Sequence, residues 1–240
     1  MSKKLNTNSN VYIIIYAMVM VVIVAFLLAF VSKALQPKSD ANVAIDKKSQ
    51  ILAALNIREV DKDDVETKYA EVVEADKIVK ADGTEINDGA NKQEAAFKMT
   101  SKEITDDNLP LYICTVEGTT KYVVPGYGMG LWGGLWGYVA INEDGKTVYG
   151  AYFSHESETA GLGALISEEP FQNLFKEKVA YNEDGTVALS VVKKGKAVEG
   201  LNDNSRCDAI TGATLTSDGV DLMLKTCLAK YTGVFKALAK

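Results

Sequence analysis

Residues that usually form metal centres are scarce in this chain. Its 240 residues include one histidine, His155, and three cysteines at 114, 207 and 227 that show no Cys-x-x-Cys spacing. Zinc sites need several Cys or His ligands, and a disulfide framework needs an even set of cysteines. The sequence therefore predicts no metal site and no disulfide framework, although one pair of cysteines could bridge if the domain is exported.

Acidic residues are absent from the first 33 positions and dominate the rest of the chain. The net charge is −6 overall, and the 23 basic and 32 acidic residues outside that segment leave the remainder at −9. A surface of this sign repels nucleic acid and anionic lipid headgroups. We therefore expect no nucleic-acid partner.

An uncharged apolar run stands near the N-terminus. Val11–Val31 contains 21 residues without charge or proline, which as a helix spans about 30 Å, the thickness of the hydrocarbon core of a bilayer. The run exceeds the roughly 7–15 apolar residues of a signal peptide, and a core helix apolar on every face would be unusual at this position. The sequence predicts a transmembrane helix over residues 11–33.

Charge bias hardly orients this helix, because lysines lie on both sides of it, at 3 and 4 and at 33 and 38. Short N-terminal tails often remain cytoplasmic. We therefore expect a cytoplasmic segment at 1–10, and a single-pass protein of the cell inner membrane with the rest on the periplasmic side.

The remaining sequence predicts an α+β protein. Residues 34–75 are expected to form a linker at Pro37–Asp40 and helices at 46–55 and 62–74, followed by one domain over 76–240. Within that domain, short alternating runs at 111–116 and 120–124 predict an antiparallel hairpin around Glu117-Gly118. Asn-Glu-Asp-Gly occurs at 142–145 and again at 182–185, which predicts two similar hairpin turns.

Two further helices are expected in the domain. One should begin with Ser167 as its N-cap, and the last should cover Val220–Tyr231 with Thr216 or Ser217 as its N-cap. Together with the hairpins, these helices give the antiparallel α+β pattern.

A glycine-rich stretch over 126–137 contains both tryptophans, Trp132 and Trp136. Residues 128–133 match G-x-G-x-x-G, but a dinucleotide site requires a helix directly after the motif, and here a strand-like run follows. Two interpretations remain equal: a glycine-rich loop packed under aromatic side chains, and one wall of a site for a planar ligand.

Small and hydroxyl-bearing residues crowd into Cys207–Val220, just before the last predicted helix. Helix capping accounts for one hydroxyl and one carboxylate, but several others remain. Hydroxyls and backbone N–H groups at a helix N-terminus suit a phosphate group. No G-x-x-x-x-G-K-[ST] motif is present, so nucleoside triphosphate chemistry is not predicted.

The segment Asp208-Ala-Ile-Thr211-Gly212-Ala213-Thr214 resembles the flavinylation motif D-x-x-[ST]-G-A-T of the FMN-binding domain family. The resemblance implies that a dedicated flavin transferase esterifies FMN, through its phosphate, to the hydroxyl of Thr214. Thr211, Gly212 and Ala213 would shape the turn, and Asp208 would assist the modifying enzyme.

Three features together resemble the C subunits of sodium-translocating NADH:quinone oxidoreductases. They are the single N-terminal span, GYGMGLWGGLWGYVAI at 126–141 and HESETAGLGA at 155–164. This similarity implies a covalent-FMN subunit of a six-subunit membrane pump, which relays electrons from NADH toward ubiquinone while sodium is exported. The chain would not be a catalyst on its own, and no direct NADH or quinone site is expected in it.

The resemblance also implies which residues surround the flavin. One departure is Ala160, where the family pattern has proline. The residues expected to line the flavin are Glu158, Thr159, Gly161, Leu162 and Gly163, with Trp132 and Trp136 from the glycine-rich stretch.

Two alternatives share parts of this pattern. One is the equivalent FMN subunit of a ferredoxin:NAD+ oxidoreductase complex, against which the GLWGGLWGYVAI stretch argues. The other is a membrane-tethered FMN-binding sensor, which would be expected to carry further transmembrane or signalling segments.

Overall fold

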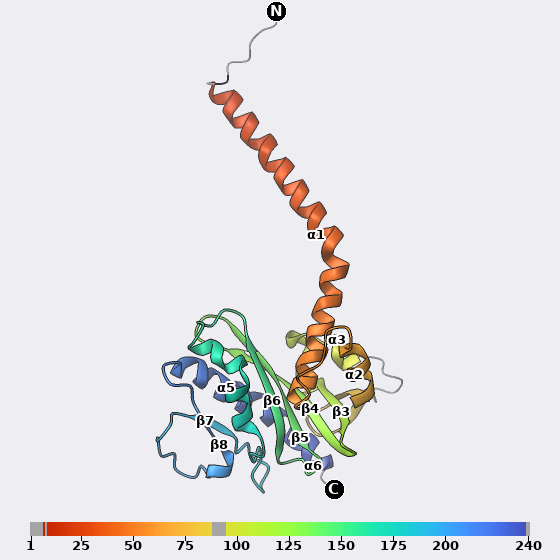
Figure 1. The fold of residues 1–240 in the computed structure, drawn as a ribbon, viewed down its shortest axis with the longest axis vertical. Helices are drawn as coiled ribbons and strands as arrows, with labels where there is room; N and C mark the ends of the chain where they lie inside the picture. The colour runs from red at the N-terminus through yellow and green to blue at the C-terminus, as the bar shows by residue number, and fades with distance from the viewer. Residues whose placement is uncertain (1–6, 8, 88–94, 239–240) are drawn as a thin grey trace, which may run out of the picture. The chain divides into compact units, whose positions relative to one another are not determined.

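A computed structural model describes residue 7 and residues 9–87 and 95–238. The chain divides between Asp46 and Lys47 into two compact units, which are described separately. The helix α1, Asn10–Ala54, contributes to both (Figure 1).

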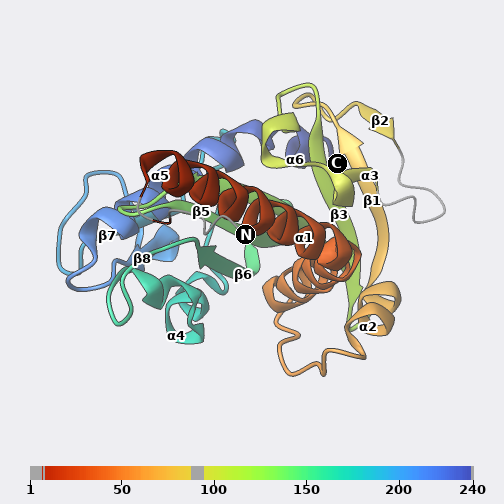
Figure 2. The same cartoon turned by 90° about the horizontal axis from the view of Figure 1, so that it is seen from above.

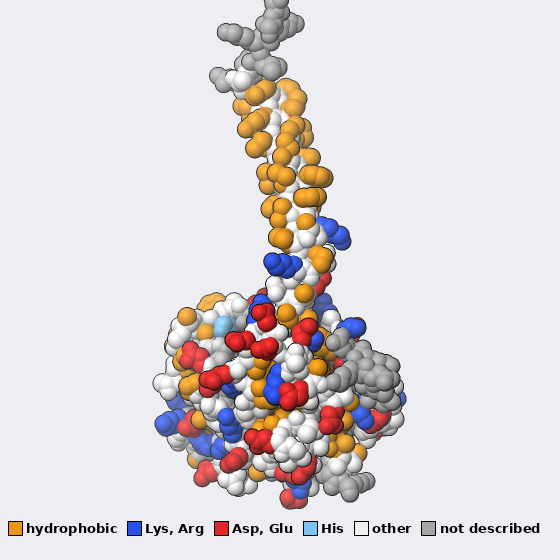
Figure 3. Space-filling view, turned by 45° about the vertical axis from the view of Figure 1, so that its right-hand side comes forward, with side chains coloured by type: hydrophobic (Ala, Val, Ile, Leu, Met, Phe, Trp, Pro, Cys, Tyr) orange, Lys and Arg blue, Asp and Glu red, His pale blue; other side chains and the backbone are white. Residues whose placement is uncertain are grey.

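The first unit consists mainly of α1 up to Asp46. The large side chains of its apolar run are exposed, and the face seen in Figure 3 shows them in orange along the helix. Among the described residues, this is the one helix that is long and apolar enough to cross a membrane. It suits a single membrane anchor.

The predicted linker at Pro37–Asp40 is wrong, because these residues lie inside α1. Proline removes one backbone hydrogen bond from a helix but does not always end it. The surrounding residues 33–46 contain no glycine and several good helix formers, which accounts for the continuous helix.

The end of α1 belongs to the second unit, where it and the residues after it contact the strand residues 149–151. Residues 51–55 are buried. A Cβ on Gly150 would lie 2.4 Å from the Ala54 carbonyl oxygen, so glycine permits the close approach. Beyond the helix, Asn56 donates to the Tyr149 carbonyl at 2.9 Å and Arg58 donates to the Ala151 carbonyl at 3.1 Å.

A six-stranded antiparallel sheet forms the centre of the second unit, in the order β2-β1-β3-β4-β5-β6. The turn after β3 has positive φ at Glu117 (52°) and Gly118 (76°), as a two-residue hairpin requires, and confirms the hairpin predicted there. The strands are β1 Val73–Val79, β2 Glu85–Asn87, β3 Leu109–Val116, β4 Thr119–Met129, β5 Gly134–Asn142 and β6 Val148–His155.

Helices cover this sheet. Helices α2 and α3 pack against β1 and β3 (Figure 2), while α5 packs mainly along β4. The α-helices of the second unit are α2 Val65–Val72, α3 Ala95–Lys98, α4 Glu169–Gln172, α5 Thr214–Lys230 and α6 Thr232–Leu238. A short parallel pair, β7 Ser190–Val192 and β8 Arg206–Asp208, stands apart from the large sheet. This mixture confirms the α+β prediction.

Both predicted helix starts differ from the structure. Helix α5 begins at Thr214, so Thr216 and Ser217 lie within its first turn and neither is its N-cap. Ser167 ends the 3₁₀ segment Gly163–Ser167, and its hydroxyl donates to the Ala164 carbonyl at 2.8 Å, so it does not cap α4. In both cases a tertiary or local hydrogen bond uses the hydroxyl that capping would need.

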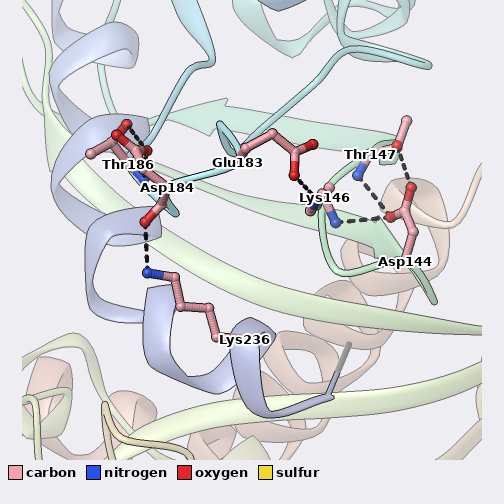
Figure 4. Close-up of polar contacts among 7 residues, drawn as sticks. All are labelled: Asp144, Lys146, Thr147, Glu183, Asp184, Thr186 and Lys236. Atoms are coloured by element: carbon pink, nitrogen blue, oxygen red, sulfur yellow. Dashed lines mark hydrogen bonds and ion pairs between the residues drawn. The ribbon is translucent and has the colours of Figure 1, made fainter. Parts of the chain in front are cut away.

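The two Asn-Glu-Asp-Gly turns lie side by side (Figure 4). Lys146, which follows the first turn, forms an ion pair of 2.8 Å with Glu183 of the second. Asp144 accepts the amide of Lys146 at 2.8 Å, and Asp184 accepts that of Thr186 at the same distance. The first turn joins β5 to β6, whereas the second is closed by one isolated bridge, so the two hairpins differ in extent.

The core includes three phenylalanines in contact. The Phe153 ring centroid lies 4.9 Å from that of Phe175 and 6.0 Å from that of Phe171. Phe153 is fully buried, while Leu174 beside Phe175 is 38% exposed.

We expect Phe153→Ala to lower the free energy of unfolding by about 3–5 kcal/mol, because a cavity replaces a buried ring. Urea unfolding of the full chain in detergent, followed by tryptophan fluorescence, measures this loss. Leu174→Ala is the matched control and should cost much less; equal losses would contradict the described core.

Candidate functional site

The first turn of α5 presents Thr214 to solvent. Thr214 is the first residue of this 17-residue helix and is exposed. The first backbone N–H groups of a helix lack intrahelical partners and carry partial positive charge. A phosphate at the Thr214 hydroxyl would therefore lie where the helix favours an anion.

The turn before α5 is fixed by a serine inside the helix. The Ser217 hydroxyl accepts the Ile210 amide at 3.1 Å and donates to the Ala213 carbonyl at 2.9 Å. Gly212 has φ +84°, a conformation that favours glycine. The Thr211-Gly-Ala segment is thus held as a tight turn directly before Thr214.

Asp208 stands on the far side of that turn, at the end of β8. Its Oδ1 lies 3.6 Å from Nε of Arg206, and its side chain is 42% exposed. Thr211 is exposed between Asp208 and the helix. Within the segment 208–214, the polar side chains of Asp208, Thr211 and Thr214 thus reach the surface, while Ala213 is buried and Ile210 packs against the core.

The loop with the other predicted flavin residues lies beside this turn. A Cβ on Gly212 would be 3.1 Å from Cδ2 of Leu162. The amides of Leu162 and Ala164 both donate to the Thr159 carbonyl at 3.1 Å, and Gly161 has φ +73°. The tight turn therefore forms with Ala160 in the position where the family pattern has proline.

The glycine-rich stretch 126–137 comprises the end of β4, the loop 130–133 and the start of β5, so a strand and not a helix follows the G-x-G-x-x-G residues. It lies against α5, since a Cβ on Gly219 would be only 2.3 Å from the Met129 carbonyl oxygen. Trp132 is 64% exposed on this loop. Trp136 instead lies within β5, where its indole N–H donates to Oε1 of Gln50 at 3.1 Å.

Glu158 connects these segments. Its carboxylate accepts the Thr216 hydroxyl at 2.5 Å and the Trp132 amide at 2.8 Å, and it is 7% exposed. Burial raises the pKa of this carboxyl, but the hydrogen bonds from Thr216 and from the amides of Trp132 and Leu131 hold the pKa below its ordinary value. Glu158 is therefore ionised at neutral pH.

Large apolar side chains are exposed around the site, and Figure 3 shows such orange side chains beside the single histidine. The fractions are 70% for Met129, 48% for Leu131, 42% for Leu162 and 60% for Leu215. Sequence reasoning missed Met129, Leu131 and Leu215, and also the role of Thr216. Apolar residues within glycine-rich or hydroxyl-rich turns were the available signal, since such positions are ordinarily polar.

Residues 130–229 match the family described as FMN-binding domain. This range contains the β4–β5 loop, the turn around Leu162 at 159–164 and the first turn of α5. The fold and the site therefore define an FMN-binding protein. The C subunit of the Na(+)-translocating NADH-quinone reductase from Haemophilus ducreyi is 30% identical over 257 residues, covering 98% of this chain and 98% of that protein. The corresponding protein from Neisseria meningitidis is also 30% identical, covering 92% of this chain and 90% of its own.

A crystal structure of the C subunit from Parabacteroides distasonis superposes with a TM-score of 0.74 at 37% identity, covering 84% of this chain and 96% of that one. The chain belongs to the family of C subunits of the Na+-translocating NADH:quinone reductase. It is thus an FMN-binding subunit of a sodium-pumping enzyme, as the motifs predicted, and the family match favours this assignment over the ferredoxin-linked complex and the sensor.

We expect Gly219→Ala to destabilise the protein by about 1–3 kcal/mol, because the added methyl group would meet the Met129 carbonyl. This loss should appear although alanine is about 1 kcal/mol better than glycine inside a helix. Thermal unfolding of the full chain measures it, with Asp218→Ala on the exposed face of α5 as the control. A Gly219→Ala protein as stable as the control would contradict the close packing.

Proposed function

We propose that this protein holds FMN as a phosphoester on Thr214 and relays electrons from NADH toward ubiquinone within the sodium pump. The observation that carries the proposal is the exposed Thr214 hydroxyl at the first position of α5, inside the matched FMN-binding region.

The states of the neighbouring hydroxyls support Thr214 as the attachment residue. Those of Thr216 and Ser217 already donate to Glu158 and to the Ala213 carbonyl, and both residues are buried. Thr211 is exposed but lies in the turn before Thr214 and is therefore outside the helix. Thr214 combines exposure with the positive end of the helix dipole.

The apolar side chains around Thr214 suit the rest of the cofactor. The isoalloxazine ring is planar and largely apolar, and exposed residues such as Trp132, Leu162 and Leu215 offer surfaces on which it can pack. Bound FMN supplies the electron-transfer chemistry. The chain's own residues would hold the phosphate and orient the ring: Thr214 and the N-terminus of α5 would bind the phosphate, and the exposed apolar side chains would pack on the ring.

We extend the proposal to the cellular arrangement of the protein. Helix α1 anchors the protein in the inner membrane beside the other subunits of the pump, and the FMN-binding unit lies on the periplasmic side. A flavin transferase acts during maturation. This chain contributes no direct NADH or quinone site. Thr159 and Gly161 are the other exposed positions that would line the flavin, whereas Glu158 and Gly163 are buried and the Trp136 indole is bound to Gln50.

Thr214→Val should abolish covalent flavin, because valine keeps the shape of threonine but lacks the oxygen that would form the ester. Intact-mass and peptide mapping of the protein from native membranes should show one FMN less one water on the wild-type peptide and none on the variant. Thr119→Val, at the exposed first residue of β4, should retain full flavin, and Thr214→Ser should retain some. Flavin that persists on Thr214→Val would refute the attachment site.

The membrane topology can be tested by thiol labelling. Burial raises the pKa of all three native cysteines, to about 12 for Cys207, so they react slowly. Thr119→Cys should react with a membrane-impermeant maleimide when the outer membrane alone is permeabilised, whereas Ser2→Cys should react only after lysis. The reverse pattern would place the FMN-binding unit in the cytoplasm.

A further inference from the structure

Glu158 lies in a space shaped by two glycines. A Cβ on Gly130 would be 2.5 Å from one carboxylate oxygen, and a Cβ on Gly163 would be 2.5 Å both from the other oxygen and from the Thr216 hydroxyl. Side chains at either glycine would therefore displace the carboxylate. Two separate loops thus leave room for the same buried group.

Both oxygens of that carboxylate bind protein groups from different segments. One accepts the Thr216 hydroxyl of α5, and the other accepts the Trp132 amide of the β4–β5 loop. The backbone of Glu158 itself is held at the end of β6, where its amide donates to Nδ1 of His155 at 3.2 Å. The carboxylate therefore connects the loop, the helix and the 156–163 turn.

Thr214 and Thr216 lie on opposite sides of α5. Two residues advance a helix by about 200°, so one hydroxyl faces solvent while the other faces Glu158, which matches their exposed and buried states. The hydrogen bond to Thr216 consequently ties the Trp132 loop to the same helical turn in which Thr214 lies.

We propose that Glu158 and Thr216 are positioning residues, which fix the Trp132 loop against the first turn of α5 and thereby set how the indole meets a flavin on Thr214. The proposal rests on the FMN site described above for its flavin part only. Trp132 suits this role because its backbone is bound on both sides, the amide by Glu158 and the carbonyl by the Ser157 hydroxyl at 2.8 Å, while its side chain remains exposed.

Hydrogen exchange in the flavin-free full chain, in a Thr214→Val background, tests the roles of Glu158 and Thr216 without the cofactor. Thr216→Val should lower the protection of the Trp132 amide about tenfold or more, since it leaves a buried charged oxygen without its donor. Thr115→Val is the matched control, because Thr115 donates to Glu74 over the same 2.5 Å at an exposed site. Thr216→Ser should restore protection.

The flavin-loaded protein gives the second readout. Thr216→Val and Glu158→Gln should each change the visible circular dichroism of FMN, and the change should be absent in a Trp132→Phe background. Glu158→Gln also serves if Thr216→Val fails to fold. The proposal would be overturned if Thr216→Val left the exchange of the Trp132 amide unchanged, or if Thr216→Ser did not restore its protection. It would also be overturned if the circular dichroism of FMN changed equally in the Trp132→Phe background. Flavin remaining on the Thr214→Val background would instead refute the attachment site and leave the exchange result valid.

Discussion

The approach of α5 to β4 is the constraint on which the site depends. A Cβ on Gly219 would lie 2.3 Å from the Met129 carbonyl, and one on Gly128 would lie 2.8 Å from Cβ of Met223. Helix and strand can come this close only because each contributes a glycine where they meet. The same packing brings the N-terminal turn of α5 beside the β4–β5 loop and the Leu162 turn, which are distant in sequence.

Hydrogen bonds then fix the three segments that the contact between α5 and β4 brings together. Two of the hydroxyls after Gly212 are used internally: Ser217 closes the turn before the helix, and Thr216 binds Glu158. A buried carboxylate is costly unless it is hydrogen-bonded, and Glu158 receives donors from two other segments. Its ionised state and the geometry of the site therefore stabilise each other.

Much of this arrangement was predictable from local sequence. The hairpin at Glu117-Gly118 follows from turn chemistry, and the apolar run of α1 follows from composition. The segment 208–214 was identified by its motif, because its spacing is short and specific. Helix starts were less predictable: Thr216 and Ser217 have good capping side chains, but tertiary and local partners engage those hydroxyls and the helix begins at Thr214.

The contact between Glu158 and Thr216 joins residues 58 positions apart, and no local rule predicts it. It does explain why hydroxyls are concentrated in this segment. If Thr214 carries the cofactor as proposed, the inner face of the same helical turn must be fixed. The buried Thr216 hydroxyl bound to Glu158 fixes it and leaves the outer face exposed. Under the proposed function, the two threonines would have different tasks on one helical turn: the exposed Thr214 would offer an oxygen to the cofactor, and the buried Thr216 would hold the surface on which the cofactor rests.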